Sequence, residues 1–139
     1  TTALFLASKK ENSEIVKFLL TRPNINTNEK SIILHKKKSC EMTPLHIAVE
    51  KGNSKIVRLL LQNYETDINM KKIKKSHHKL KEKTSLIIST NEGNYEITRI
   101  LLSCSKIDCN IKYLKQTKGK IVEFTALNMY LRVCLILMI

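Results

Sequence analysis

Apolar residues recur at helical spacing in three short stretches of the chain, and polar connections separate these stretches. Within each stretch the apolar positions lie one, three or four residues apart, which gives a helix one apolar side. The three sets are Ile15, Val16, Phe18, Leu19 and Leu20; Ile56, Val57, Leu59, Leu60 and Leu61; and Ile97, Ile100, Leu101 and Leu102. Asn53 and Asn94 stand just before the second and third sets, where an asparagine side chain can cap a helix. The pattern predicts one amphipathic helix in each stretch.

A shorter helix is predicted ahead of each amphipathic one. The expected ranges are Ala3–Lys10, Pro44–Lys51 and Ser85–Asn91, preceded by Thr2, Thr43 and Thr84. A threonine hydroxyl can accept a hydrogen bond from a free N–H of the first turn, so these threonines are good N-caps. Pro44 falls at the first helical position, where its missing N–H costs nothing. Gly52 and Gly93 follow their helices, as a left-handed residue does at a helix C-terminus.

These landmarks repeat with a fixed period. Thr2-Ala3-Leu4, Thr43-Pro44-Leu45, Thr84-Ser85-Leu86 and Thr125-Ala126-Leu127 begin 41 residues apart at every step. Self-similarity at a fixed period of about 20–50 residues is the signature of a solenoid, in which stacked units share one core. A solenoid is usually a surface that holds other molecules, and catalysis has to be argued separately.

The repeating unit resembles the ankyrin repeat. Its second copy carries Thr43-Pro44-Leu45-His46-Ile47-Ala48, close to the opening signature of that family, and then Gly52-Asn53, Ile56-Val57, Leu60-Leu61 and Asp67-Ile68-Asn69. The third copy keeps Gly93-Asn94, Leu101-Leu102 and Asp108-Cys109-Asn110, and the first is aligned on Ile15-Val16 and Asn24-Ile25-Asn26. The resemblance implies an all-α helix-turn-helix solenoid with long β-turn fingers. It also implies structural roles for Thr43, Pro44, Leu45, His46, Ala48, Gly52 and Gly93, with His46 bonded to the Thr43 hydroxyl and nearby backbone.

HEAT and armadillo repeats are the competing interpretation, because their period of about 40–47 residues fits better than the period of about 33 in ankyrin repeats. From Thr43 to Leu61, however, every landmark sits at the ankyrin offset, so the helices have not been lengthened. The surplus lies in the connections, which span 17 residues from Asn26 to Thr43 and 15 residues each from Asn69 to Thr84 and from Asn110 to Thr125. Long surface loops cost little closure entropy, and the sequence therefore predicts enlarged fingers.

One array is expected to cover residues 1–139, with units at about 2–42, 43–83 and 84–124 and a partial fourth at 125–139. The chain is interpreted as a piece of a longer array, since it lacks an initial Met and Thr1 directly precedes a landmark. Leu131–Ile139 is nearly all apolar but shorter than the roughly 20 residues that cross a bilayer. We expect a half-repeat helix there, stacked on the third unit, and a monomer unless this end self-associates.

The first and third units depart from the pattern. Glu11 stands where Gly52 and Gly93 stand, so a left-handed turn there would be strained or rearranged. The third unit has Ser85, Ile87 and Ser89 in place of Pro, His and Ala, which should lower its stability.

The net charge of +13 is concentrated in the fingers. Residues 28–41 carry four Lys and two Glu, residues 70–83 carry seven Lys and one Glu, and residues 111–120 carry four Lys. Such lysines could attract nucleic acid, anionic lipid or an acidic protein. They could equally be solvated loops that keep the chain soluble and discourage edge pairing, or a bias of composition. Only Tyr113 interleaves them, which disfavours base stacking.

Cysteine and histidine do not point to a chemical site. Cys40, Cys104, Cys109 and Cys134 lack paired spacing, so we expect free thiols in a reducing, intracellular compartment, the cytoplasm. His77-His78 matches no zinc pattern, and no nucleophile or paired acid accompanies His46. We therefore predict no metal, no cofactor and no enzymatic activity.

The function predicted from these observations is a protein–protein interaction scaffold. By resemblance to ankyrin arrays, the partner would lie on the concave face made by the fingers and the first helices. The candidate surface residues are Lys36, Lys37, Lys38, Glu50, Lys51, Lys71, Lys72, Lys74, Lys75 and Glu92. The partner would be a protein, for which the lysines favour acidic character. The alternative is electrostatic binding of nucleic acid or anionic membrane by the fingers.

Overall fold

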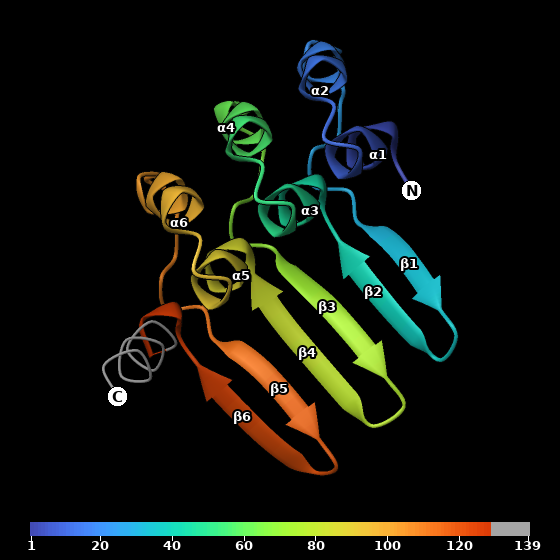
Figure 1. Ribbon diagram of the computed structural model, residues 1–139, viewed down its shortest axis with the longest axis vertical. Helices are drawn as coiled ribbons and strands as arrows, with labels where there is room; N and C mark the ends of the chain where they lie inside the picture. Colours follow the sequence, from blue (N-terminus) through green and yellow to red (C-terminus); the bar gives the residue numbers. More distant parts are fainter. Residues whose placement is uncertain (129–139) are drawn as a thin grey trace.

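A computed structural model describes residues 1–128 of the chain, in which helix pairs alternate with hairpins (Figure 1). The helices are α1 (Ala3–Lys9), α2 (Ser13–Leu20), α3 (Pro44–Glu50), α4 (Ser54–Gln62), α5 (Ser85–Asn91) and α6 (Tyr95–Leu102). The strands are β1 (Ser31–His35), β2 (Lys38–Met42), β3 (Lys71–Ser76), β4 (Lys79–Thr84), β5 (Tyr113–Thr117) and β6 (Lys120–Phe124). α1, α3 and α5 form an inner row beside the hairpins, and α2, α4 and α6 form an outer row (Figure 1). The predicted helix pairs are confirmed.

The helix ends form as their capping residues predict. Thr2 Oγ1 accepts a hydrogen bond of 3.1 Å from the Phe5 N–H, and Thr43 and Thr84 cap α3 and α5 in the same way. Asn12, Asn53 and Asn94 cap the outer helices, each accepting an N–H three residues on at 3.0 Å. The turns between the helices are left-handed, with φ of 58° at Glu11, 70° at Gly52 and 68° at Gly93. Glu11 therefore keeps the turn that a glycine makes elsewhere, at a steric cost.

One continuous core runs between the two rows of helices. The outer helices contribute Val16, Ile56, Val57, Leu60, Ile97 and Leu101, all fully buried, and the inner helices contribute Leu4, Leu45, Ala48, Leu86 and Ile87 among others. Full burial of one such aliphatic side chain favours folding by about 1.5–3 kcal/mol. Because these residues come from every unit, the units stabilise one another as in other solenoids.

The fingers pair with one another, and the predicted all-α class is therefore wrong. Within residues 1–128 the hairpins form one six-stranded antiparallel sheet in the order β1-β2-β3-β4-β5-β6. Adjacent strands lie about 4.8 Å apart, so a hairpin is about 9.6 Å wide along the array. Packed helices lie about 8–10 Å apart, and stacked units therefore bring neighbouring hairpins to pairing distance. The interpretation of the lysines as residues that prevent edge pairing is also wrong for the edges between fingers.

The first finger begins two residues later than the sequence alignment placed it. Asn26-Thr27-Asn28, and not Asn24-Ile25-Asn26, corresponds to Asp67-Ile68-Asn69. The Asn28 N–H donates to Asn26 Oδ1 at 2.9 Å, as the Asn69 and Asn110 N–H groups donate to Asp67 and Asp108 at 2.9 Å. With this correction all three connections have the same length, because Asn28, Asn69 and Asn110 recur with the 41-residue period.

These asparagines also join each unit to the next. Asn28 Nδ2 donates to the Glu65 carbonyl and Asn28 Oδ1 accepts from the Asp67 N–H, both at 2.7 Å. Asn69 makes the same pair with Lys106 and Asp108, both at 2.8 Å. One side chain therefore satisfies a donor and an acceptor of the following connection, which fixes the spacing of the units.

Tyr130 and Leu131–Ile139 lie outside the described residues, and so does the expected terminal helix. Within residues 1–128 no helix is both long enough and apolar enough to cross a membrane.

Candidate functional site

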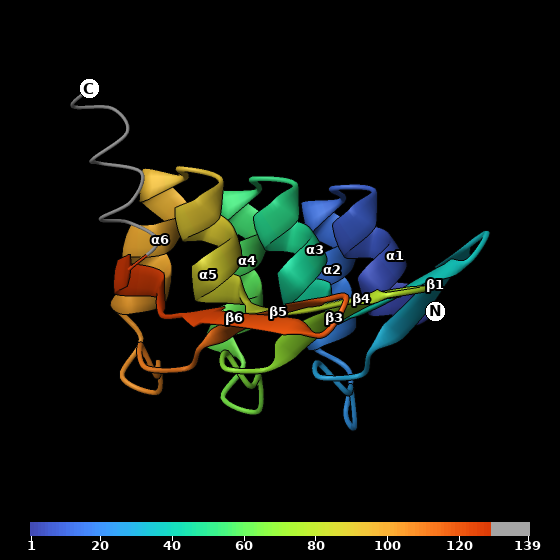
Figure 2. The same ribbon diagram turned by 90° about the horizontal axis from the view of Figure 1, so that it is seen from below.

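The inner helices and one face of the sheet form a single concave surface. The helices rise from this face of the sheet, and the connections before each finger hang below the other face (Figure 2). We call the first face of the sheet the helix-facing face and the second the opposite face. The concave surface consists of the helix-facing face and the adjoining sides of α1, α3 and α5.

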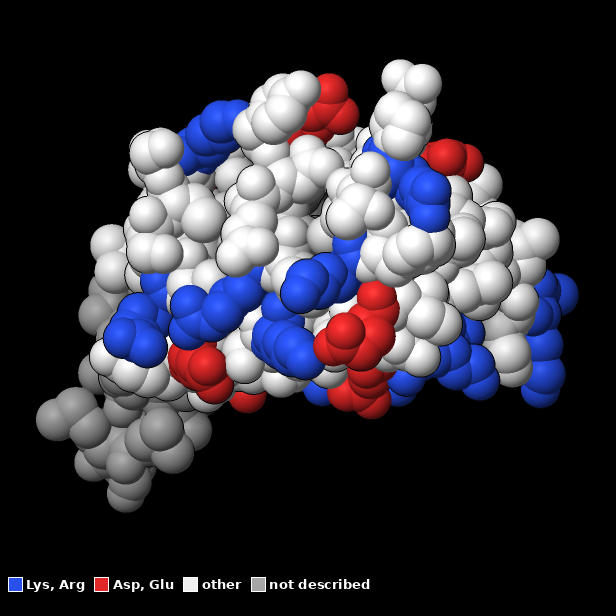
Figure 3. All heavy atoms as spheres, turned by 90° about the horizontal axis from the view of Figure 1, so that it is seen from above, with Lys and Arg blue, Asp and Glu red and all other residues white. Residues whose placement is uncertain are grey.

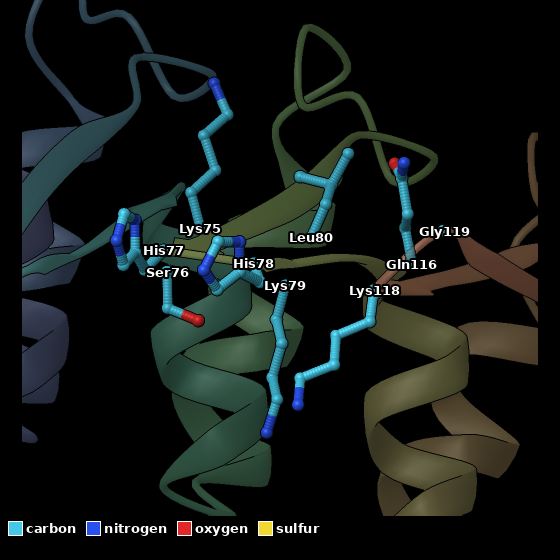
Figure 4. A pocket seen from close by; sticks show the side chains of 9 residues that line it. All are labelled: Lys75, Ser76, His77, His78, Lys79, Leu80, Gln116, Lys118 and Gly119. Carbon is cyan, nitrogen blue, oxygen red and sulfur yellow. The ribbon is translucent and has the colours of Figure 1, made fainter.

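Strand register assigns each finger side chain to one of the two faces. Lys72 Nζ pairs with the Glu50 carboxylate at the end of α3, so Lys72 lies on the helix-facing face. Directly opposed residues of paired strands share a face, and faces alternate along a strand. The lysines on the helix-facing face are therefore Lys38, Lys72, Lys74, Lys79, Lys81, Lys83, Lys115 and Lys120. At the tips, Ser76, Lys79 and Lys118 extend toward the helices, whereas Lys75, Leu80 and Gln116 extend the other way (Figure 4).

The carboxylates of the strands all lie on the opposite face. Glu41, Glu82 and Glu123 recur with the 41-residue period and are out of phase with Lys72 in the register. Each binds a lysine on its own face, as shown by the ion pairs Lys75–Glu41 at 3.6 Å, Lys71–Glu82 at 2.9 Å and Lys112–Glu123 at 3.4 Å. The opposite face is thus locally neutralised, and the helix-facing face keeps a positive excess.

Three lysines form a row across neighbouring strands of the helix-facing face. Lys74 of β3 stands directly opposite Lys81 of β4, which stands directly opposite Lys115 of β5. The row ends at Cys40 of β2, whose thiol pKa is raised mainly by burial, and at Val122 of β6. Partial burial lowers the pKa of Lys81, and Lys115, Lys74 and Lys79 lower it further. Like charges directly opposed across strands destabilise a sheet.

The base of the concave surface carries both signs of charge. Burial is the main cause that lowers the pKa of Lys83 and raises that of Glu92. The carboxylate of Glu50 raises the pKa of Glu92 further, whereas Lys83 and Lys72 lower it. Lys83 Nζ also lies 5.2 Å from the centre of the Tyr113 ring, a cation–π distance. Positive and negative charges therefore balance where the fingers meet the helices, whereas positive charge is in excess toward the finger tips.

The structure divides the surface predicted from the sequence between several places. Lys38, Lys72 and Lys74 lie on the helix-facing face; Lys71 and Lys75 on the opposite face; Lys36 and Lys37 at the tip of the first finger; and Glu50, Lys51 and Glu92 at the ends of α3 and α5. The residues that prediction missed are Lys79, Lys81, Lys115 and Lys120. No pattern in the lysine-rich fingers marks them as strand residues, and the strand register is needed to place these lysines on one face.

His46 is buried at the start of α3. Its Nδ1 accepts a hydrogen bond of 3.0 Å from the Thr43 N–H and lies 2.8 Å from Thr43 Oγ1. Its Nε2 lies 2.8 Å from the Met70 carbonyl, to which it donates. Burial lowers the pKa of His46 to about 4, so the ring is neutral and ties α3 to the start of the second finger.

The remaining surfaces show weaker signs of a site. An open hollow of about 430 Å³ lies between the tips of the second and third fingers, where the rings of His77 and His78 stack at 4.3 Å (Figure 4). Across residues 1–128 no three or more His, Cys, Asp or Glu side chains are placed to share a metal ion. The outer face mixes both signs of charge (Figure 3), with ion pairs such as Lys55–Glu14 at 3.4 Å.

Sequence comparison identifies the family of this fold. A model of ankyrin repeats, in three copies, matches residues 4–113. The chain belongs to the ankyrin-repeat family. Ankyrin repeats are generally protein–protein interaction modules and are typically non-catalytic. A comparison with curated proteins finds no match.

Proposed function

We propose that this ankyrin-repeat protein is a non-catalytic scaffold that holds a protein partner on its concave surface. The observation that carries the proposal is the joining of the fingers into one sheet, whose helix-facing face continues into the inner helices. Paired strands hold side chains at fixed spacings, which suits shape-specific recognition better than separate loops do. The half-buried ion pair of Lys72 with Glu50 further anchors the sheet to α3.

Nucleic acid or anionic membrane is the competing partner for the same lysines. Proteins that bind single strands combine basic grooves with exposed aromatic rings on which bases stack. The phenylalanine and tyrosine residues in the described strands are Tyr113, which is buried, and Phe124, which is half-buried against it at 5.1 Å. Tyr64 and Tyr95 are exposed but follow α4 and begin α6, away from the sheet. These placements favour a protein partner over a base-stacking one.

The proposed compartment is reducing and intracellular. Cys40, Cys104 and Cys109 are free thiols, and Cys40 is half-buried beside the lysine row. Free cysteines are typical of proteins that stay in such a compartment.

Site-specific photocrosslinking in cells tests the proposed surface. A photoreactive residue in place of Lys79 probes the helix-facing face, and one in place of Leu34 probes the opposite face, since both positions are exposed. We expect a discrete protein adduct from the Lys79 position that nuclease treatment leaves unchanged, and none from the Leu34 position. Equal adducts from both positions, or an adduct that nuclease removes, would contradict the proposal.

A further inference from the structure

The row of Lys74, Lys81 and Lys115 is an arrangement that weakens the free protein. The three ammonium groups come from directly opposed positions on β3, β4 and β5. Within residues 1–128 none of them lies within ion-pair distance of a carboxylate, whereas Lys72 has Glu50. A carboxylate on any of these strands at a helix-facing position would neutralise the row, yet Glu41, Glu82 and Glu123 all face away.

We infer that this row is the recognition site for an acidic helix of a partner protein, which lies across the fingers along the array. The inference rests on the proposed function and specifies the partner of the same surface. The row crosses two strand spacings, about 9.6 Å. A helix places residues i, i+4 and i+7 on one side over about 10.5 Å, with neighbours about 5–6 Å apart. Three carboxylates at that spacing therefore match the three lysines.

An extended acidic segment matches the row less well. Alternate residues of a strand lie about 6.6 Å apart, so three carboxylates on one side span about 13 Å. A phosphate backbone would find the same charges, but the ring of Tyr113 is buried and that of Phe124 is half-buried against it, so neither offers a free face on which bases stack. The helix is thus the occupant whose spacing and chemistry agree with the row.

The variants that test the inference differ only in the face that they alter. Lys74→Gln/Lys81→Gln/Lys115→Gln removes the row, and Lys71→Gln/Lys75→Gln/Lys112→Gln removes three lysines that bind Glu82, Glu41 and Glu123 on the opposite face. Both variants lose the same charge from the same sheet. Loss of like-charge repulsion should raise the melting temperature of the row variant, and loss of ion pairs should lower that of the control. The row variant is therefore expected to fold.

Binding is measured with synthetic peptides by fluorescence anisotropy. One helical peptide carries glutamates at i, i+4 and i+7, and a second of identical composition spreads them around the helix. We expect the first to bind the wild-type chain more tightly than the second. Each exposed ion pair contributes about 0.2–1 kcal/mol, so removal of the three lysines should weaken binding of the first peptide by about 3- to 150-fold. The opposite-face variant should change it less than about twofold.

Three results would overturn the inference. They are equal weakening by both variants, equal affinity for the two peptides, and row-dependent binding of oligothymidine or phosphatidylserine vesicles that exceeds binding of the acidic helix. If the peptides fail but a protein still crosslinks from the position of Lys79, the acidic helix is refuted and the proposed scaffold stands. If the peptides bind through the row but the position of Lys79 yields no protein adduct, the proposed function is refuted, and the affinity of the row for an acidic helix still stands.

Discussion

The buried ring of His46 should make the stability of the array depend on pH between about 4 and 6.5. Its pKa falls from 6.5 to about 4 on folding, chiefly through burial, and the hydrogen bond to the Met70 carbonyl only partly offsets this effect. The folded state therefore binds fewer protons than the unfolded state throughout this range. Stability is fully present above pH 6.5 and is lost as the pH falls toward the folded pKa.

The size of the loss follows from the two pKa values. Each pKa unit corresponds to about 1.4 kcal/mol, so His46 alone should remove about 2 kcal/mol from the free energy of unfolding at about pH 5 and about 3 kcal/mol at about pH 4, relative to pH 8. A loss of this size is a large part of the free energy of unfolding of a domain of ordinary stability.

Urea unfolding followed by circular dichroism measures this effect against a matched variant. His46→Gln keeps one donor and one acceptor near Thr43 and Met70 but does not titrate. The variant should be less stable than the wild type at pH 8, and the difference should shrink as the pH falls. Parallel stability curves for the two proteins from pH 8 to pH 5 would refute the assignment of a buried neutral ring.

Two further changes in stability follow from the joints between and within units. Asn69→Ala removes two hydrogen bonds, to the Lys106 carbonyl and from the Asp108 N–H, and should lower the free energy of unfolding by about 1–2 kcal/mol in urea titrations. Asn110→Ala is its control and should cost less; equal losses would contradict a joint at Asn69. Glu11→Gly should raise the melting temperature, with a gain of about 1 kcal/mol, because Glu11 has φ of 58°. An unchanged or lower melting temperature would show that the turn carries no strain.

The helices could be predicted from the sequence because their determinants are local. Thr43 and Asn53 cap helices by bonding N–H groups three residues away, and the apolar spacing after Asn53 marks a buried side. At Glu11 the sequence left open a strained or a rearranged turn, and the structure has the left-handed one, with φ of 58°. The alignment error at Asn24 arose because Asn-x-Asn occurs twice in overlapping positions, and the 41-residue period alone distinguishes them.

The sheet could not be predicted in the same way. β3 reads Lys-Lys-Ile-Lys-Lys-Ser, which shows neither the apolar alternation nor the residue types that usually mark strands. Its pairing depends on the agreement between hairpin width and helix spacing, which is a property of the stacked units. The row of Lys74, Lys81 and Lys115 depends in turn on that pairing, because register decides which face each lysine occupies. The charge of the fingers was visible in the sequence, but its separation onto two faces was not.

Amide hydrogen exchange along the fingers tests most directly whether they form one continuous sheet. In an isolated hairpin only alternate amides of each strand are hydrogen-bonded, whereas an inner strand bonds to neighbours on both sides. β3 pairs with β2 and β4, and β4 pairs with β3 and β5. We predict slow exchange at consecutive residues from Ile73 to Lys75 and from Leu80 to Glu82, with alternating protection in β1 and β6. Alternating protection in β3 and β4 as well would show three separate hairpins and would contradict the shared surface.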